Sequence, residues 1–580
     1  MCGIIGFYLN RALNEKDIKK GIDGLKSQNH RGPDFSDTWI NKKQGIFLGH
    51  NRLSIIDLNK SSNQPMEQNN VVLTYNGEIY NYKILKEKYF NKRDKFNSNS
   101  DTEVLLKLWN LKKERSLEEL DGMFAFAVFE KNLISLAVDP FGEKPLYYFQ
   151  DSQGIYFASE IEALSKICNF KLREDNSFIS EFLLFGYINS PFTPYDGVNK
   201  VSPSTLVQFR KENGLFKKTE STYWEKPKRT YSKGKSKTIS AENIKQLKNL
   251  IIQSVESRLV SDVPIGLFLS SGIDSSLIAS IISLELKKQI NCYTVKFDKN
   301  LVHDESFFAS KIAKYLNLDH EVLVNKSKHE YSTNNLLKLY SKDYNDNPTI
   351  FSYYEMSLLA SKKIKVAISG LGGDELFLGY NRYYFFERYF KLIMFLKKFK
   401  TPINFINFKY LNSLKKLDTL NKNFLNVPIN EFYLRYKNLD QFDLFNQDSI
   451  NVLKNIFDLN DKNLFEEIFM YDIEKTMPCS YIPCSDMGGM KASLEIRSPF
   501  LNKEIYEFMA ENFDHKEILK LGGKKILSQI LSSYIPLDLI PNKKRGFIFP
   551  IDKLLHGEGG SYISKRVLLR KKILNESSSY

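Results

Sequence analysis

The chain has 580 residues, 42% of them hydrophobic and 26% charged, a composition typical of globular proteins with buried cores and not of disordered chains. This length predicts about two to four domains. The 83 basic residues exceed the 68 acidic ones by 15, but the lysines are spread through the sequence, which favours a solvated surface bias over a nucleic-acid-binding patch.

The chain begins MCGIIGFYL, so removal of Met1 would leave Cys2 as the N-terminal residue. Its α-amine, with a pKa of about 7.7–8.0, could then accept the proton of the thiol, whose pKa is about 8.5. A thiol that carries its own base can act as a nucleophile near neutral pH. For an isolated Cys2 a buried structural thiol would be the simpler interpretation, so the segments that follow decide between the two.

Five polar segments follow Cys2, separated by apolar, strand-like runs such as 71–74 and 124–129. This alternation predicts loops at one edge of a sheet sandwich. The segments are HRGPD from His30, GHNRLSIIDL from Gly49, QPM from Gln64, YNGEIYNY from Tyr75 and SDTEVLL from Ser100.

This set of segments resembles the class II glutamine amidotransferase domain, an N-terminal nucleophile hydrolase, and above all that of the glutamine-dependent asparagine synthetase family. The resemblance implies that Cys2 attacks the side-chain amide of glutamine, which releases ammonia and leaves a glutamyl thioester. It also implies that Asn76 and the backbone N–H of Gly77 hold the oxyanion, and that Arg52 pairs with the α-carboxylate of glutamine. The further glutamine-binding residues that it implies are Leu53, Ser54, Ile55, Ile56, Glu78 and Asp101.

Two details of this region differ from a simple reading of the motifs. His50 suggests a cysteine–histidine dyad, but the resemblance favours a structural histidine. The family usually has arginine before the aspartate of SLAVDPFGEKPLYY, and here Val138 precedes Asp139. This change weakens a local ion pair and leaves the catalytic residues unaffected.

The resemblance implies two domains with different folds. We expect an α+β N-terminal nucleophile hydrolase domain, an αββα sandwich, over residues 2–210 and a linker over 211–240, where 226–240 combine Lys, Ser and Pro without an apolar period. From 241 to 570, alternating segments predict an α/β domain with a parallel sheet and a pyrophosphate loop. The expected strands are 265–269, 290–297 and 366–369, and the expected helices are 305–316, 351–362 and an amphipathic 383–399.

The stretch LFLSSGIDSS, residues 267–276, follows one of these strands. Small residues permit a sharp turn, after which Asp274 or Ser275 could cap a helix, and a helix N-terminus attracts anions. An ordinary strand–turn–helix is the alternative. The Walker pattern is absent, but the stretch resembles the pyrophosphate loop of ATP pyrophosphatases, which cleave ATP between the α and β phosphates. The apolar face expected for the helix comprises Leu277, Ile278, Ile281, Ile282 and Leu284.

A second cluster, AISGLGGDELFLGYNRY from Ala367, follows another expected strand. A surface turn with an acidic pair is the alternative, but Asp374 with Asp274 could hold Mg²⁺ against pyrophosphate oxygens. The resemblance assigns the two aspartates this role and so implies ATP and Mg²⁺ as cofactors. The residues that it places at ATP and pyrophosphate are Leu269, Ser270, Ser271, Gly272, Asp274, Ser275, Val295, Ser369, Gly370 and Asp374.

A third cluster, DMGGMKASLEIRSPFLN from Asp486, is similar to a further segment of the family. It predicts that Asp486, Glu495 and Arg497 form one buried polar network beside the acceptor pocket. Lys524 and Lys544 match two late lysines of the family and could neutralise phosphate charge. Solvated surface lysines are the alternative for both.

The departures from the family concentrate on the acceptor side. Asparagine synthetases carry an acidic residue where this chain has Leu371, and leucine can neither accept a proton nor hold a cation. Aspartate is the first acceptor that we expect, and the alternative is another carboxylate, such as a uronic-acid sugar of a surface polysaccharide. An RNA-modifying protein and an inactive scaffold are more distant alternatives. The other departures are Ser271, Leu378, Asn502 and Ser528.

The remaining expectations concern the setting of the protein. Five cysteines, an odd number, do not suggest a disulfide framework, and we expect Cys479 and Cys484 to be core or loop thiols. The sequence contains neither a signal peptide pattern nor eighteen consecutive apolar residues. We therefore expect a cytoplasmic enzyme with glutamine and a carboxylate as partners, without nucleic acid or membrane, for which a homodimer is one open arrangement.

Overall fold

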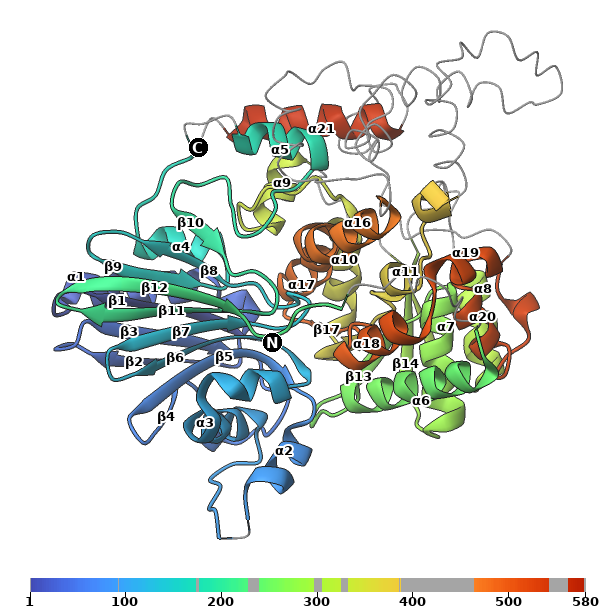
Figure 1. Cartoon of the computed structure of the whole chain (residues 1–580), viewed down its shortest axis with the longest axis horizontal. Helices are drawn as coiled ribbons and strands as arrows, with labels where there is room; N and C mark the ends of the chain where they lie inside the picture. The colour runs from blue at the N-terminus through green and yellow to red at the C-terminus, as the bar shows by residue number, and fades with distance from the viewer. Residues whose placement is uncertain are drawn as a thin grey trace.

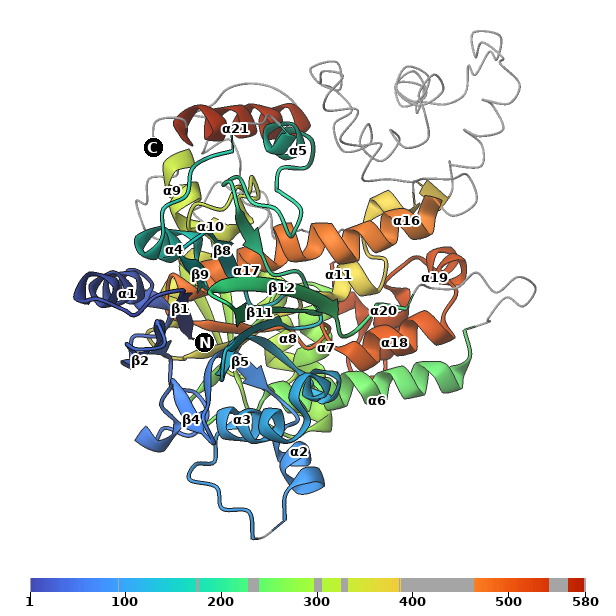
Figure 2. The same cartoon turned by 60° about the vertical axis from the view of Figure 1, so that its left-hand side comes forward.

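The computed structural model describes residues 2–91, 93–173, 177–227, 239–296, 305–324, 332–384, 386–387, 464–541 and 562–577. Two stacked sheets with helices on their outer faces make up one side of the molecule (Figure 1). A five-stranded sheet surrounded by helices makes up the other side. The view in Figure 2 shows the same two regions side by side.

The first sheet has six antiparallel strands in the order β10-β8-β9-β1-β3-β2. Its pairing places Gly3 opposite Asn51 and Phe35 opposite Arg52. The ends of β1 and β3 that carry the predicted polar residues therefore lie together. The strands are β1 (Gly3–Leu9), β2 (Phe35–Asn41), β3 (Ile46–Arg52), β8 (Tyr147–Gln150), β9 (Gly154–Ala158) and β10 (Val198–Lys200).

The second sheet is also antiparallel, in the order β12-β11-β7-β6-β5-β4. It extends into the segment 211–240 that we expected to be a linker, because β12 pairs along its whole length with β11. A linker from residue 211 is therefore wrong for this stretch. The strands are β4 (Met66–Gln68), β5 (Val71–Ile79), β6 (Gly122–Glu130), β7 (Leu133–Val138), β11 (Thr205–Glu212) and β12 (Leu215–Thr222).

The αββα sandwich predicted for the N-terminal region is confirmed by the way in which β6 divides its side chains. Because successive residues of a strand face opposite sides, Ala125 and Ala127 pack between the two sheets, whereas Phe124 and Phe126 face the outer helices. Trp109 packs against Phe126 from outside. The outer helices are α2 (Tyr82–Tyr89) and α3 (Asp101–Lys112) on this sheet, and α1 (Glu15–Ser27) and α4 (Ile161–Ile167) on the first sheet.

The C-terminal region contains the predicted parallel sheet, with the strand order β15-β14-β13-β16-β17 and every pair parallel. The central strand β13 begins at the expected residue 265 and ends at 268. Its side chains are buried on both faces of the sheet, Leu267 in the core with α7 and Phe268 in the core with α10, which accounts for its apolar sequence. The strands are β13 (Ile265–Phe268), β14 (Asn291–Lys296), β15 (His320–Val324), β16 (Val366–Ile368) and β17 (Glu495–Arg497).

Helices cover this sheet, and three of them correspond to expected ones. α7 (Ile273–Ser280) follows β13 and continues as a π-helical turn over Ile281–Glu285, which leaves Leu284 44% exposed and not on the buried face as expected. Most of the expected helix 383–399 lies outside the described residues. The other helices are α5 (Ser177–Phe185), α6 (Ala241–Arg258), α8 (Ser306–Tyr315), α9 (Thr333–Leu339), α10 (Thr349–Ala360), α11 (Gly373–Leu376), α16 (Leu464–Tyr471), a π-helical stretch (Asp472–Tyr481), α17 (Ile482–Met490), α18 (Lys503–Asn512), α19 (His515–Leu521), α20 (Lys525–Leu531) and α21 (Tyr562–Ser577).

Two general expectations can be compared with this fold. All five cysteines are free and buried, as expected for core thiols without a disulfide framework. Among the helices that the structure describes, none combines the length and the apolar character needed to cross a bilayer.

Candidate active site

Cys2 lies directly before β1, with 7% of its surface exposed. Its backbone nitrogen donates a hydrogen bond to Oδ1 of Asn76 on β5, 2.9 Å away. These strands belong to different sheets, so the stacking of the sheets brings the two residues together across 74 positions of sequence. Burial raises the pKa of the Cys2 thiol, because the thiolate loses its hydration. The thiol therefore needs a base before it can react.

Asn76 offers an amide donor that the protein itself does not use. The residue is fully buried, and its Nδ2 has no hydrogen-bond partner among the residues that the structure describes. Because an unpaired buried donor costs about 1–3 kcal/mol, such a group next to a thiol indicates a position for a ligand atom.

Gly77, the next residue, is required by the backbone. It has a φ of +152°, and a Cβ at this position would lie 2.1 Å from the carbonyl oxygen of Met123 on the paired strand. Every other residue type would clash with β6. No side chain of residue 77 therefore covers the peptide N–H that follows Asn76.

Arg52 closes the loop that follows β3. Its guanidinium donates hydrogen bonds to the backbone carbonyls of Ile56, Asp57 and Asn59, and to Oδ1 of Asn63 at 2.8 Å. With 5% of its surface exposed, the side chain is almost enclosed by this loop. The position of the guanidinium is therefore fixed by the backbone of residues 56–59.

The other predicted residues of this loop provide its framework. Leu53, Ile55 and Ile56 are buried in the core beside β5 and α3. The backbone N–H of Ser54 donates to Oδ2 of Asp34, 2.7 Å away. The loop is thus held by its apolar side chains on one side and by its backbone on the other.

Asp101 lies at the start of α3, where Ser100 caps the helix by accepting a hydrogen bond from the N–H of Glu103. The Asp101 carboxylate accepts hydrogen bonds from the hydroxyl of Tyr75 at 2.8 Å and from the N–H of Ile79 at 3.0 Å. Burial nevertheless raises the pKa of Asp101. These contacts tie the N-terminus of α3 to β5, which carries Asn76.

Glu78 lies on β5 at the border with the C-terminal region. Its Oε1 is 3.4 Å from the guanidinium of Arg497, which also binds Glu495 at 2.6 Å. Burial, reinforced by the negative charge of Glu495, raises the pKa of Glu78 well above its usual value. The predicted glutamine pocket and the third sequence cluster therefore share one buried boundary.

His50 has a structural environment, in agreement with our expectation. Its Nε2 lies 3.0 Å from the carbonyl oxygen of Tyr75, and because a carbonyl can only accept, this nitrogen carries the proton. Burial lowers the pKa of His50 to about 3, so the imidazole is neutral near pH 7.

The loop after β13 is shaped by two serine hydroxyls. The N–H of Gly272 donates to Oγ of Ser270 at 3.1 Å, and the N–H of Ser270 donates to Oγ of Ser275 at 3.1 Å. α7 begins with Gly272 as its N-cap and without a side-chain cap. The expectation that Asp274 or Ser275 caps this helix is therefore wrong, because the Ser275 hydroxyl is engaged in shaping the loop.

The other predicted ATP residues gather around this loop because parallel strands end at one edge of the sheet. Leu269 follows β13, Ser369 and Gly370 follow β16, and Val295 is near the end of β14. Gly370 approaches the loop so closely that a Cβ there would lie 2.8 Å from Cβ of Asp274. The backbone N–H of Ser271 donates to Oε2 of Glu305, 3.4 Å away, and not to a serine of the loop.

Lys524 joins the two predicted metal-binding aspartates. Its ammonium forms ion pairs with the carboxylates of Asp274 and of Asp374, the latter at 2.8 Å. Although burial disfavours the charged form, the two carboxylates raise the pKa of Lys524 above its usual value. Two carboxylates from the first turns of α7 and α11 thus converge on one cation, a donor set that also suits Mg²⁺. Lys544 lies outside the described residues.

On the acceptor side, Leu371 is half-buried and packs against the apolar core. Leu378 is fully buried with a φ of +55°, a left-handed conformation that glycine, the residue of the family at this position, adopts without strain. Both departures therefore place an apolar side chain against the core on either side of α11, which carries Asp374.

Asp486 does not join Glu495 and Arg497, contrary to our expectation. Its carboxylate binds Arg31 at 2.9 Å and Lys144 at 3.2 Å, both from the sandwich. Arg31 is fully buried, and its Nε donates to the carbonyl oxygen of Cys2 at 3.2 Å. Arg31 and Lys144 were not among the predicted site residues, although both lie inside segments that carry the resemblance.

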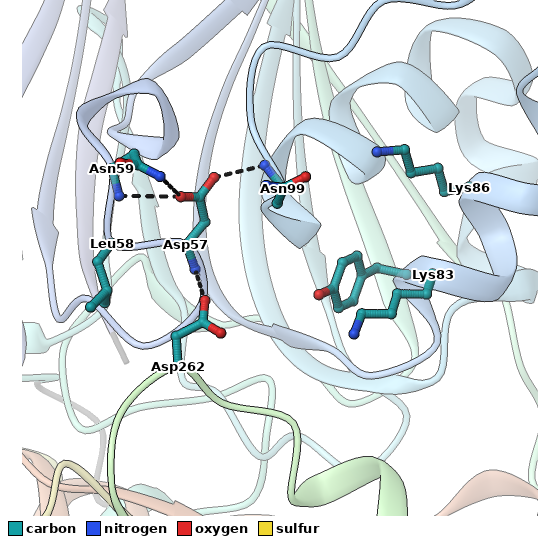
Figure 3. A pocket seen from close by; sticks show the side chains of 8 residues that line it. Asp57, Leu58, Asn59, Lys83, Lys86, Asn99 and Asp262 are labelled. Carbon is teal, nitrogen blue, oxygen red and sulfur yellow. Dashed lines mark hydrogen bonds between the residues drawn. The ribbon is translucent and has the colours of Figure 1, made fainter. Parts of the chain in front are cut away.

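A cavity of about 590 Å³ lies beside the loop of residues 52–59, from here on the 52–59 loop (Figure 3). None of the predicted site residues lines it. Its charged groups come from both regions of the chain, which marks it as part of their boundary. The lining residues are Asp57, Leu58, Asn59, Tyr82, Lys83, Lys86, Asn99 and Asp262.

Two family models together match most of the chain. Residues 1–224 match the family model of the glutamine amidotransferase domain, and residues 246–571 match that of asparagine synthase. The glutamine-hydrolyzing asparagine synthetase 1 of Bacillus subtilis is 30% identical over 584 residues, which cover 97% of this chain and 89% of that protein.

Two further relatives share the same region at lower coverage. The glutamine-hydrolyzing asparagine synthetase B of Escherichia coli is 29% identical over 66% of this chain and 65% of its own length. The amidase chry2 of Gibberella zeae is 29% identical over 66% of this chain and 60% of its own length. The last two relatives carry different names at the same identity and the same coverage of this chain.

Proposed function

Because the chain belongs to the asparagine synthase family, whose members are ATP-dependent, glutamine-hydrolysing amidotransferase ligases, we propose that it makes asparagine from aspartate. In this proposal glutamine supplies ammonia and ATP adenylates the side-chain carboxylate of aspartate. Ammonia then displaces AMP, and the products are asparagine, glutamate, AMP and pyrophosphate. We also propose a cytoplasmic location, with a homodimer as one possible assembly.

The observation that supports the glutaminase half most directly is the unused amide donor of Asn76 beside Cys2. Removal of Met1 would convert the Cys2 nitrogen into an amine, and this amine would take the proton of a thiol whose pKa burial has raised. The thiolate would attack the amide carbon of glutamine. Nδ2 of Asn76 and the N–H of Gly77 would stabilise the oxyanion.

The 52–59 loop would hold the amino-acid end of glutamine. The α-carboxylate would take the place of the Asn59 or Asn63 oxygen that Nη1 of Arg52 now binds, while Nη2 stays on the carbonyls of Ile56 and Asp57. The backbone of Leu53, Ser54, Ile55 and Ile56 would form the wall of the pocket. Glu78 and Asp101 would bind or orient the α-amino group.

The ATP half would use the loop after β13. The start of α7 would bind pyrophosphate oxygens, with Lys524 neutralising their charge. The N–H groups of residues 270–272 would contribute by exchanging their side-chain acceptors on Ser270, Ser275 and Glu305 for these oxygens. Asp274 and Asp374 would hold Mg²⁺, which supplies additional charge neutralisation when bound. Leu269, Val295, Ser369 and Gly370 would contact the nucleotide, and we keep Lys544 as a further candidate.

A second candidate function is the amidation of another carboxylate, such as a uronic-acid sugar. The apolar side chain of Leu371 favours it, because asparagine synthetases carry an acidic residue at this position.

The test measures AMP and asparagine formed by the full-length chain from glutamine, aspartate and MgATP. We expect both products. Cys2→Ala should abolish the reaction with glutamine but not with ammonia, and Asp274→Ala should abolish synthesis but not glutamine hydrolysis. Asn76→Asp keeps the acceptor for the Cys2 N–H but loses the donor, so it should lower glutamine turnover by about 10²–10³-fold.

The other outcomes separate the alternatives. Glutamine hydrolysis without aspartate-dependent AMP, together with AMP formation from a uronic acid, would replace aspartate by that acceptor. Glutamine hydrolysis that survives Cys2→Ala would exclude the proposed nucleophile.

A further inference from the structure

Asp262, a residue of the C-terminal region, joins the two regions of the chain at the 52–59 loop. Its backbone N–H donates to the carbonyl oxygen of Ile55 at 3.0 Å, and its Oδ2 accepts from the N–H of Asp57 at 2.7 Å. Figure 3 shows the carboxylate of Asp262 directed at the backbone of Asp57. One residue therefore holds the loop backbone at two points.

The same backbone segment positions Arg52. The carbonyl oxygens of Ile56 and Asp57, which flank the N–H that Asp262 binds, both accept from the Arg52 guanidinium. The side chain of Asp57 fixes the segment further, because its oxygens accept from Asn59 at 2.7 Å and from the N–H of Asn99 at 2.7 Å. A displacement of the backbone at Asp57 would therefore move the guanidinium of Arg52.

Along the chain, Asp262 leads through β13 to the loop of residues 269–272, here called the ATP loop. It lies three residues before β13, the central strand of the parallel sheet, and the loop with Ser270 and Gly272 follows the end of this strand. Val263 and Ile265 also pack against the apolar core that contains Ile55. The short strand thus has the 52–59 loop at its start and the ATP loop at its end.

We propose that Asp262 is a positioning residue for glutamine, which holds the 52–59 loop in the form that lets Arg52 bind the substrate. This inference rests on the proposed function, since it assumes that Arg52 binds glutamine. In it, the C-terminal region completes the glutamine pocket without touching the substrate. Glutamine hydrolysis consequently depends on a carboxylate outside the amidotransferase domain.

The test compares glutamine hydrolysis by the full-length wild type with that by Asp262→Ala and Asp262→Asn. Loss of one hydrogen bond should raise the KM for glutamine about fivefold in Asp262→Ala, with kcat within about twofold. Asp262→Asn retains a side-chain oxygen and should restore the KM to within about twofold. Because Asp262 is exposed, we expect both variants to fold. Synthesis driven by ammonia does not use the loop and should stay unchanged.

Lys83→Ala is the matched control, because Lys83 lines the same cavity from α2. It should leave the KM for glutamine within about twofold. An unchanged KM in Asp262→Ala, or an equal fall in the ammonia-driven reaction, would overturn the inference. Absence of glutamine hydrolysis in the wild type would instead overturn the proposed function.

Discussion

At the scale of single residues, the site depends on polar groups whose protonation is set by burial. His50 is the best defined, because its neighbour is a backbone carbonyl and its pKa is lowered to about 3 by burial. Asn76 complements it with a buried donor that has no partner among the described residues. The imidazole of His50 stabilises the packing of β3 against β5, and the amide Nδ2 of Asn76 remains available to a substrate.

His50 gives a prediction about pH. Its pKa is lower in the folded chain than the ordinary 6.5, so the unfolded chain binds the proton first as the pH falls below 6.5. This residue should therefore reduce the free energy of unfolding by about 1.4 kcal/mol per pH unit between pH 6.5 and 3. Between pH 7 and pH 5, the free energy of unfolding measured in urea should fall by about 2 kcal/mol less in His50→Gln than in the wild type.

The same variant also tests the absence of a cysteine–histidine dyad. If His50 is structural, glutamine turnover by His50→Gln at pH 7.5 should remain within about tenfold of the wild type. A fall of about 10⁴-fold would instead indicate a histidine that takes the proton of Cys2.

At the scale of elements, the ATP site is assembled from three segments that are distant in sequence. The first turn of α7 supplies Asp274, α11 supplies Asp374, and Lys524 precedes α20. Their meeting point lies at the C-terminal edge of the parallel sheet, where each strand delivers its loop. The lysine keeps two carboxylates close together that would otherwise repel each other.

Removal of this lysine should affect only one half of the reaction. In Lys524→Ala the carboxylates lose their shared cation and the phosphates lose a neutralising charge, so AMP formation should fall by at least about 10²-fold. Glutamine hydrolysis should be unchanged. Lys525→Ala, at the exposed neighbouring position, serves as the control and should retain AMP formation. Equal activities of the two variants would contradict a role for Lys524 at the phosphates.

At the scale of the whole molecule, buried charges fasten the sandwich to the parallel-sheet region. Asp486 on α17 binds Arg31 and Lys144 of the sandwich, and Glu160 of the sandwich binds Lys491 at 3.1 Å. Arg31 also contacts the Cys2 carbonyl, so the start of β1 lies against this network. The position of Cys2, the proposed nucleophile, is therefore a property of the assembled chain.

Asp486→Asn should weaken this attachment strongly. Loss of one partner from a buried ion pair costs about 3–5 kcal/mol, because the remaining charges stay desolvated. We expect a lower temperature of thermal unfolding, and calorimetry should show the two regions unfolding separately. Glu321→Gln, which breaks an exposed pair with Lys363, should leave the thermogram unchanged. A shift no larger than that of this control would contradict the assignment.

The sequence by itself determined the features that short segments encode. The apolar stretch from Ile265 predicted β13 within one residue, and the motifs around Cys2, Asn76 and Asp274 predicted both domain types. Local patterns suffice here because side-chain periodicity and turn-forming residues act over a few positions. The role of each site residue stays a prediction that the proposed assays test.

Only the tertiary structure decided which distant charges meet. It separated Asp486 from Arg497, placed Lys524 between two aspartates and joined Asp262 to the 52–59 loop. It also included β12 in the second sheet, where pairing with β11 outweighs the linker-like composition of the region around it. Partners of this kind depend on how sheets and helices pack, and a buried charge pairs with the nearest charge in space, whatever its distance along the chain.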